Sequence, residues 1–166
     1  MLNLFRKRNS ALDVSDDEIV APADGMIIDV TSVSDPIFSE SKLGPEVAFQ
    51  YSGSKVTLCA PANGELSVLF PTGHAFGITM KNGVEILVHC GVDTVEAKGD
   101  GFTLFDKKQG DSVKAGEPII TVDLNKLKAR YDMSTMLIIT ESNGQTFQFK
   151  GPGAIARGDS LTADLH

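Results

Sequence analysis

Nine segments of strand length, each rich in apolar residues, alternate with turns rich in glycine, proline and asparagine along this 166-residue chain. Short strands at such regular intervals are typical of antiparallel sandwiches and barrels. We therefore expect an all-β fold, an antiparallel β-sandwich or barrel. The expected strands are residues 25–33, 46–51, 55–60, 64–70, 74–80, 84–91, 118–124, 134–142 and 145–150.

Helical structure is expected only in one or two short pieces. Residues 123–131 predict a short helix, because Asp123 can cap its start and apolar residues then recur at helical spacing. Residues 1–18, which end in an acidic run, predict a flexible N-terminal tail. Residues 19–166 predict a single domain, which the length of the chain allows.

Charge and composition exclude several classes of protein. The net charge of −7 argues against a nucleic-acid partner, because neutralising phosphates requires a basic surface. No apolar run approaches the roughly 20 residues of a membrane span, and the first residues do not form a signal peptide. Two cysteines, Cys59 and Cys90, are too few for a disulfide framework. We therefore expect a cytoplasmic protein.

Two short motifs occur twice. An Ala-Pro-Ala-Asx-Gly motif begins at Ala21 and again at Ala60, and Gly-Asp-Ser occurs at residues 110–112 and 158–160. In each copy of the first motif, a proline precedes a strand and an Asx-Gly pair follows as a turn signal. These repeats indicate a duplicated β motif.

The hairpin expected over residues 74–91 carries two of the three histidines of the chain, His74 and His89. Its turn contains Asn82-Gly83, the strongest short hairpin signal. A loop with an even number of residues makes paired residue numbers sum to 163 or 165, and both imidazoles then share one face. Only an odd-residue loop would separate them. Phe76, Ile78, Leu87 and Glu85 would lie on the histidine face, and Val84, Ile86, Val88 and Cys90 on the other.

Three roles are open to such a pair. The two histidines could be ordinary buried residues, or they could bind zinc, although two ligands are too few without a carboxylate from a partner. A neutral imidazole could instead act as a nucleophile that carries a phosphoryl group, while its neighbour donates a hydrogen bond to the transferring oxygens. The hydroxyl of Thr72, two residues before His74, could fix the tautomer of that ring.

Most of the chain, from about Ala21 to beyond Ala154, resembles the glucose-class enzyme IIA family of the phosphoenolpyruvate-dependent sugar phosphotransferase system. The most specific matching sequences are "TGHAF" and "VEILVHCGVDTVEAKGDGF", and the others are "APADG", "IFSE", "APANGELSVLF", "GDSVKAGEPI" and "DLNKLKA". The resemblance implies an antiparallel β-sandwich with a duplicated hybrid motif, in agreement with the repeats.

The resemblance also implies roles for individual residues. His89 would accept a phosphoryl group from the phosphocarrier HPr and donate it to a cysteine of a sugar-specific IIB domain, which drives sugar uptake. His74, held by Thr72, would stabilise the phosphoryl group during transfer. No cofactor is implied beyond this covalent group, and zinc could bind His74 and His89 only with a partner's help. The expected partner-binding residues are Asp35, Ile37, Phe38, Leu43, Phe70, Leu87, Asp93 and Val95.

Two other classes of protein compete with this interpretation. A lipoyl- or biotinyl-type carrier domain would use Lys81 at the hairpin tip, but it leaves the histidine pair unexplained. A zinc metallopeptidase with a hybrid-motif sandwich would require more ligands than the pair offers.

Cys90 departs from the family pattern, and we expect this cysteine to behave as a small buried apolar residue. Some relatives regulate other proteins, and residues 1–8 could make at most weak membrane contact.

Overall fold

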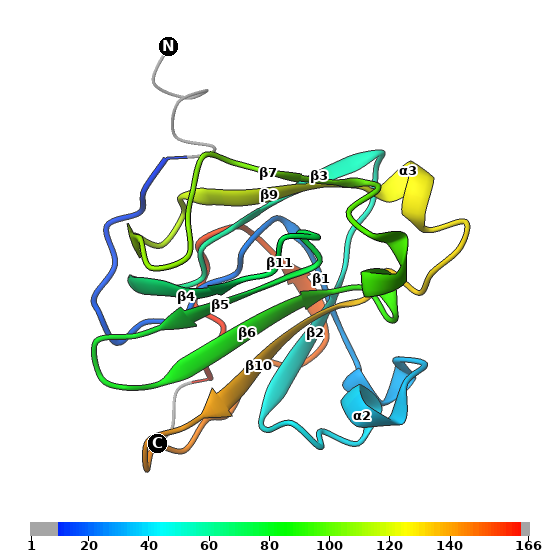
Figure 1. Cartoon of the computed structure of the whole chain (residues 1–166). Helices are drawn as coiled ribbons and strands as arrows, with labels where there is room; N and C mark the ends of the chain where they lie inside the picture. Colours follow the sequence, from blue (N-terminus) through cyan, green and yellow to red (C-terminus); the bar gives the residue numbers. More distant parts are fainter. Residues whose placement is uncertain (1–9, 164–166) are drawn as a thin grey trace, which may run out of the picture.

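Alternating burial along the strands produces two antiparallel sheets with apolar inner faces in the computed structural model, which describes residues 10–163. The larger sheet has eight strands in the order β11-β1-β2-β10-β6-β5-β4-β8, and the smaller has the order β3-β9-β7 (Figure 1). The strands are β1 (Gly25–Ile28), β2 (Glu46–Gln50), β3 (Lys55–Cys59), β4 (Gly64–Leu69), β5 (Ala75–Thr79), β6 (Glu85–Cys90), β7 (Phe102–Leu104), β8 (Ser112–Val113), β9 (Pro118–Asp123), β10 (Thr135–Glu141) and β11 (Gly153–Ile155). The predicted all-β sandwich is confirmed.

The main core lies between the two sheets. On β6, Ile86, Val88 and Cys90 are buried in it, while the alternate residues face outward. Phe49 of β2 and Leu58 of β3 are completely buried, so both sheets contribute to the same cluster. Burial of such apolar surface, at about 25 cal/mol per Å², supplies the main stabilisation. The outer face of β6 is thereby left for a second layer.

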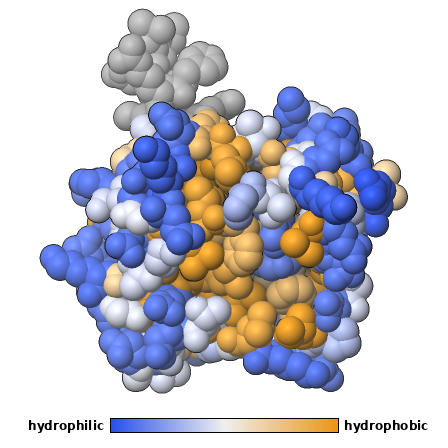
Figure 2. Space-filling model, in the orientation of Figure 1, coloured by the Kyte–Doolittle hydropathy of each residue, from blue (hydrophilic) through white to orange (hydrophobic). Residues whose placement is uncertain are grey.

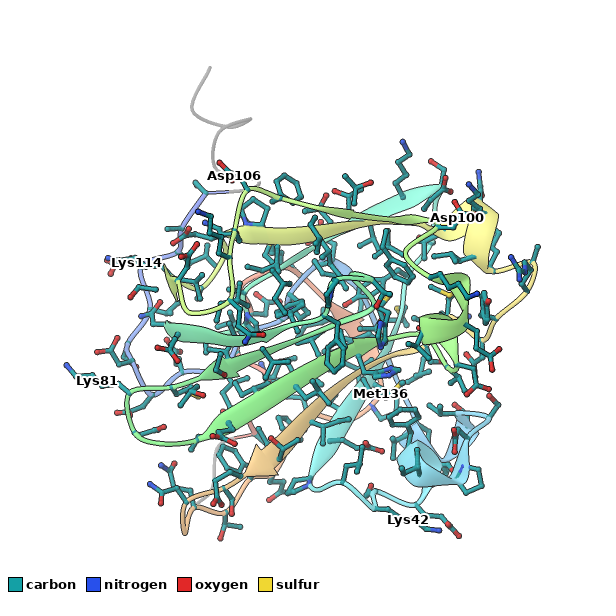
Figure 3. All side chains as sticks on the ribbon, in the orientation of Figure 1. Lys42, Lys81, Asp100, Asp106, Lys114 and Met136 are labelled. Atoms are coloured by element: carbon teal, nitrogen blue, oxygen red, sulfur yellow. The ribbon has the colours of Figure 1, made fainter. Side chains whose placement is uncertain are left out.

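A smaller apolar cluster covers that outer face, and it joins β2, β6 and β10 to a helical segment. The segment contains a 3₁₀ turn, η1 (Val30–Ser32), and a short helix, α2 (Pro36–Ser39), which lies beside β2 in Figure 1. Asp35 caps α2, because its side chain accepts the N–H of Ile37 at 3.0 Å. Met136 of β10, near the centre of Figure 3, is completely buried beneath this layer. The cluster comprises Val33, Phe38, Ala48, Val92, Met136 and Ile138.

The predicted helix over residues 123–131 is present but shorter. Asp123 caps it as expected, accepting the N–H of Lys126 at 3.1 Å, and the helix is α3 (Leu124–Leu127). A further 3₁₀ turn, η2 (Thr94–Ala97), follows β6. Within residues 10–163 no helix is long and apolar enough to cross a membrane.

Several strand boundaries differ from the prediction. β1 ends at Ile28, because the Asp29 side chain accepts the N–H of Thr31 and starts the 3₁₀ turn. Residues 145–150 form only an isolated bridge, between Phe149 and Thr162. The sequence patterns did not predict β7, β8 or β11, which are two or three residues long.

The two Ala-Pro-Ala motifs lie side by side and exchange equivalent hydrogen bonds. The N–H of Cys59 donates to the carbonyl of Pro22 at 3.0 Å, and the N–H of Val20 donates to the carbonyl of Pro61 at 2.8 Å. The two segments are therefore hydrogen-bonded to each other just before β1 and β4 begin.

The Asx residues of the two motifs also play equivalent parts. The Asp24 side chain accepts the N–H of Arg157 at 2.8 Å, and the Asn63 side chain accepts the N–H of Ala115 at 2.9 Å. Arg157 and Ala115 each precede a glycine whose N–H donates to the carbonyl of the first alanine of a motif, Gly158 to Ala21 at 3.0 Å and Gly116 to Ala60 at 2.9 Å. The equivalent segments are thus the ones around these glycines, and the two Gly-Asp-Ser copies are not at equivalent positions. This arrangement confirms the predicted duplication.

Part of the expected N-terminal tail lies against the domain. The N–H of Leu12 donates to the carbonyl of Ala115 at 2.7 Å. The Asn63 amide donates to the carbonyl of Val14 at 3.0 Å and to the side chain of Asp16 at 3.1 Å. Residues 10–18 are thus packed on the domain, whereas residues 1–9, including the segment considered for membrane contact, lie outside the described residues.

Candidate active site

The β5–β6 hairpin closes through an odd loop, residues 81–83. The N–H of Met80 donates to the carbonyl of Val84 at 2.8 Å, and Ala75 pairs with His89, so each pair of residue numbers sums to 164. The predicted sums of 163 and 165 are therefore wrong. Gly83, with φ of 87°, adopts the left-handed conformation that a three-residue loop requires.

The change of register moves some of the predicted neighbours. Phe76 and Ile78, expected beside the histidines, lie in the main core instead. Leu87 faces outward with His89, as expected. Strand alternation alone would point His74 away from His89.

The two imidazoles nevertheless meet, because His74 lies just before the first residue of β5. Gly73, with φ of 75°, turns the chain there, so strand alternation does not extend to His74. The carbonyl of His74 still accepts the N–H of Cys90 at 2.7 Å, while its ring lies 5.3 Å from that of His89 between centroids. The predicted meeting is confirmed, but the turn causes it.

His74 is held on two sides and is only 4% exposed. Thr72 Oγ1 lies 2.6 Å from His74 Nδ1, which is the contact expected from the sequence. The ring of Phe70 packs against the imidazole at 5.0 Å between centroids. Burial, assisted by the neighbouring His89, lowers the pKa of His74 below its ordinary value. The ring is therefore neutral at physiological pH.

His89 is oriented by a backbone carbonyl. Its Nδ1 lies 2.8 Å from the carbonyl oxygen of Gly91, which can only accept, so Nδ1 carries the proton and Nε2 keeps its lone pair. Phe38 packs against the ring at 5.1 Å. Burial lowers the pKa of His89, although the Gly91 carbonyl, Asp35 and Asp93 oppose that shift. A neutral imidazole with a free Nε2 is a nucleophile.

The sequence patterns missed the role of Gly91. Its φ of 82° turns its carbonyl back toward His89, and a Cβ at this position would lie 2.4 Å from Thr94 Cγ2. The only signal was the glycine that follows Cys90 at the end of a strand. Cys90 itself is buried, as predicted, and burial raises its thiol pKa to about 12.

Apolar side chains surround the histidine pair. Figure 2 shows a broad apolar band across this face of the molecule, with polar surface on both sides. Leu87 is half-buried, and Phe38, only 5% exposed, packs inward beside His89. Among the residues predicted to bind partners, the exposed apolar ones are Ile37 (38%), Leu43 (39%), Phe70 (40%) and Val95 (52%).

Two acidic residues lie near His89, whereas other charged side chains lie at the edge of the molecule in Figure 3. Asp35 and Asp93 lie close enough to His89 to affect its pKa. The labelled side chains of Lys81, Lys114, Asp100 and Asp106 lie around the rim of the view in Figure 3. Within residues 10–163, no three histidine, cysteine or acidic side chains form a set that would hold a metal ion.

Comparisons with known proteins agree with this geometry. Residues 17–145 match the model of a family described as phosphoenolpyruvate-dependent sugar phosphotransferase system, EIIA 1. The solved structure of glucose permease IIA from Mycoplasma capricolum superposes with a TM-score of 0.80 and 38% identity, over 87% of this chain and 93% of that one.

Relatives occur both alone and as part of longer proteins. The glucose-specific EIIA component of Haemophilus influenzae is 36% identical over 160 residues, which are 96% of this chain and 93% of that protein. The glucose-specific EIICBA component of Staphylococcus carnosus is 34% identical over 144 residues, and the match covers 86% of this chain but 21% of that protein.

Proposed function

This chain belongs to the EIIA 1 family of the phosphoenolpyruvate-dependent sugar phosphotransferase system, and we propose that its phosphoryl group is carried by His89 and assisted by His74. Membership makes the chain a phosphotransferase component that accepts a phosphoryl group from HPr and passes it to a IIB domain. The observation that carries the site assignment is the bond from His89 Nδ1 to the Gly91 carbonyl, which leaves Nε2 free.

Nε2 of His89 is the proposed nucleophile. Its lone pair forms a bond to phosphorus as the N–P bond of phospho-HPr breaks, and the released electron pair returns to the imidazole of HPr. The bond from Nδ1–H to the Gly91 carbonyl persists and stabilises the positive charge that the ring acquires. In the second step a cysteine thiolate of IIB attacks phosphorus, and His89 leaves as neutral imidazole.

His74 is proposed to donate a hydrogen bond to the phosphoryl oxygens. The Thr72 hydroxyl donates to Nδ1 of His74 in this scheme, so the proton of the neutral ring lies on Nε2. The phosphoryl group spreads charge over its oxygens during transfer, and a fixed donor beside them lowers the barrier. The contact between the two imidazoles supports this division of labour.

The apolar face around the pair is proposed as the docking surface for HPr and IIB. Ile37, Phe70 and Val95 would bury apolar area against a partner, while Asp35 and Asp93 would meet its basic groups. Phe38 would contribute by supporting His89 from inside, because it is buried.

We further propose a cytoplasmic location and a single IIA domain that includes residues 10–18.

The proposed function requires neither a bound metal ion nor one particular sugar. We propose that the phosphoryl group is the only group the chain carries, and that zinc would bind His74 and His89 only when a partner adds a carboxylate. Named relatives include glucose-, mannose- and glucoside-specific components, so no one sugar is proposed.

The family match disfavours the competing classes. Lys81, the lysine considered for a lipoyl or biotinyl group, has an 83% exposed side chain 3.9 Å from Asp16. That position is compatible with a solvated hairpin tip, at the opposite end of the paired strands from the histidine pair.

Labelling with radioactive phosphoenolpyruvate, enzyme I and HPr tests the assignment. The wild-type chain should gain an acid-labile, base-stable phosphoryl group, as expected of phosphohistidine, and His89→Ala should gain none. Lys81→Ala serves as a control and should be labelled normally. Wild-type labelling of a folded His89→Ala variant would refute the assignment.

A further inference from the structure

The carboxylate of Asp132, which the proposed chemistry does not use, connects the two segments that hold His89: the loop before β10 and the segment that leads into α2. Asp132 lies in the loop between α3 and β10. Its Oδ1 accepts hydrogen bonds from the N–H and the hydroxyl of Ser134, at 3.0 and 2.7 Å. Its Oδ2 accepts the N–H of Ser34, 98 residues earlier, at 3.2 Å. One side chain therefore joins two segments that are distant in the sequence.

The first connection leads to the backbone beneath His89. The carbonyl of Ser134 accepts the N–H of Gly91 at 2.9 Å, and the carbonyl of Asp132 accepts the N–H of Val92 at 2.8 Å. The carbonyl of Gly91 in turn accepts Nδ1–H of His89. The loop shaped by the Asp132 carboxylate thus fixes the peptide that selects the tautomer of His89.

The second connection leads to the apolar layer above His89. Ser34 immediately precedes Asp35, the residue that caps α2. α2 carries Phe38, whose ring packs against His89, and Ile37, which is exposed on the proposed docking face. Anchoring Ser34 therefore positions α2 both against the imidazole and toward a partner.

The carboxylate is well suited to holding both connections. Burial would raise the pKa of Asp132, but the hydrogen bonds from Ser134 and Ser34 outweigh that effect and lower it. Asp132 is therefore ionised at neutral pH, and both of its oxygens act as acceptors. An ionised acceptor also makes stronger hydrogen bonds than a neutral one.

We propose that Asp132 is a positioning residue for phosphoryl transfer: it fixes the tautomer of His89 through residues 134 and 91, and it holds α2 through Ser34. The kinetic consequences rest on the proposed function, whereas the tautomer of His89 does not. Asp132 touches neither the phosphoryl group nor the imidazole in this proposal.

Two substitutions separate the two connections. Asp132→Ala removes both, so nitrogen-15 NMR should show His89 as a mixture of tautomers. Its rate of phosphorylation at saturating phospho-HPr should fall about tenfold, as is typical for a lost supporting group. Asp132→Asn keeps one acceptor oxygen, which the two donors of Ser134 should retain. It should therefore preserve the tautomer and kcat but raise KM for phospho-HPr several-fold, because α2 is released.

Asp159→Asn is the matched control. The Asp159 side chain also accepts a hydrogen bond from a loop N–H, that of Ala156 at 3.0 Å, but it lies just after β11, the edge strand of the larger sheet. This substitution should change neither readout. A folded Asp132→Ala variant with the wild-type tautomer and rate would overturn the proposal. If that variant does not fold, an unchanged KM in Asp132→Asn would overturn it. Failure of the wild-type chain to be phosphorylated on His89 would refute the proposed function and leave the NMR test intact.

Discussion

The ring of His74 stands edge-on to the ring of His89, with centroids 5.3 Å apart and planes inclined by 79°. The two rings are held by different atoms, His74 by the Thr72 hydroxyl and His89 by the Gly91 carbonyl. A carbonyl can only accept, so Nδ1 of His89 carries its proton, whereas the Thr72 hydroxyl is able to donate to Nδ1 of His74, as the proposed function requires. Their roles can therefore be separated by substitution.

His74→Gln should still accept a phosphoryl group from phospho-HPr but should donate it to IIB about 100-fold more slowly, a typical loss for one stabilising donor. Single-turnover transfer of the labelled group from the variant to IIB measures this effect. Donation at the wild-type rate would contradict the proposed role of His74.

Thr72→Val replaces the hydroxyl with a methyl group of similar shape and frees Nδ1 of His74. We expect donation to IIB to slow by about tenfold, as for other supporting hydrogen bonds to a histidine. Thr79→Val is the control, because Thr79 donates to Ser67 at 2.8 Å, farther along β5. Equal transfer rates in the two variants would argue against a role for the Thr72 bond.

Phe70→Asp tests the docking face, since Phe70 is 40% exposed and packs against His74. If a partner buries this ring, HPr binding should weaken by at least about 1–2 kcal/mol. Isothermal titration calorimetry with HPr gives the value. Met26→Asp changes an equally apolar exposed residue on β1 and should leave the affinity unchanged; an unchanged affinity in Phe70→Asp as well would place that residue outside the interface.

The pH dependence follows from the lowered pKa values of both histidines. An NMR titration of the imidazole C–H groups should give midpoints below the ordinary value of 6.5 for His74 and His89. As the pH falls through 6.5, these histidines become protonated in the unfolded chain before they do in the folded protein. The free energy of unfolding therefore decreases as the pH falls from 6.5 to their folded pKa values. Midpoints at or above 6.5 would show that the rings are not buried as described.

Glu46 should have the opposite dependence. Burial raises its pKa from 4.5 to about 7, and its Oε2 has no hydrogen-bond partner among the described residues. The folded state therefore keeps this proton longer, and stability is lost as pH rises from 4.5 through 7. Glu46→Gln should stabilise the protein at pH 8 by on the order of 1 kcal/mol, after allowance for solvent screening of this half-exposed side chain.

Urea unfolding at pH 8 and pH 4.5 provides the measurement. The stabilising effect of Glu46→Gln should disappear at the lower pH, where the wild-type carboxyl is protonated. Glu65→Gln changes an exposed glutamate of β4 and should have no effect at either pH. A benefit from Glu46→Gln that is equal at both values would rule out the buried charge as its cause.

Local sequence patterns predicted most of the strands, because period-2 burial such as that of Ile86, Val88 and Cys90 depends only on neighbouring residues. They also predicted the cap at Asp123 and the contact between Thr72 and His74, which involve residues two or three apart. Short elements such as β8 were missed because two residues carry no measurable periodicity.

The register of the hairpin could not be read from the same patterns. Asn82-Gly83 fits even and odd loops alike, and the left-handed conformation of Gly83 selects the odd one. The prediction that His74 and His89 meet was correct for a different reason, since Gly73 turns His74 out of the strand pattern. The bond between Asp132 and Ser34 is equally hidden, because nothing local to either residue indicates a partner 98 positions away.

The hydrogen bonds of the first Ala-Pro-Ala segment also bear on how fast the chain can fold. The N–H of Ala21 donates to the carbonyl of Asp159 at 2.9 Å, and the N–H of Gly158 donates to the carbonyl of Ala21 at 3.0 Å, so the first and last described segments close on each other. Contacts between such distant parts of a chain cost loop-closure entropy before they bring any stabilisation, which places β proteins of this kind in the millisecond-to-second range. A ribosome must therefore release the chain as far as Asp159 before these bonds can form.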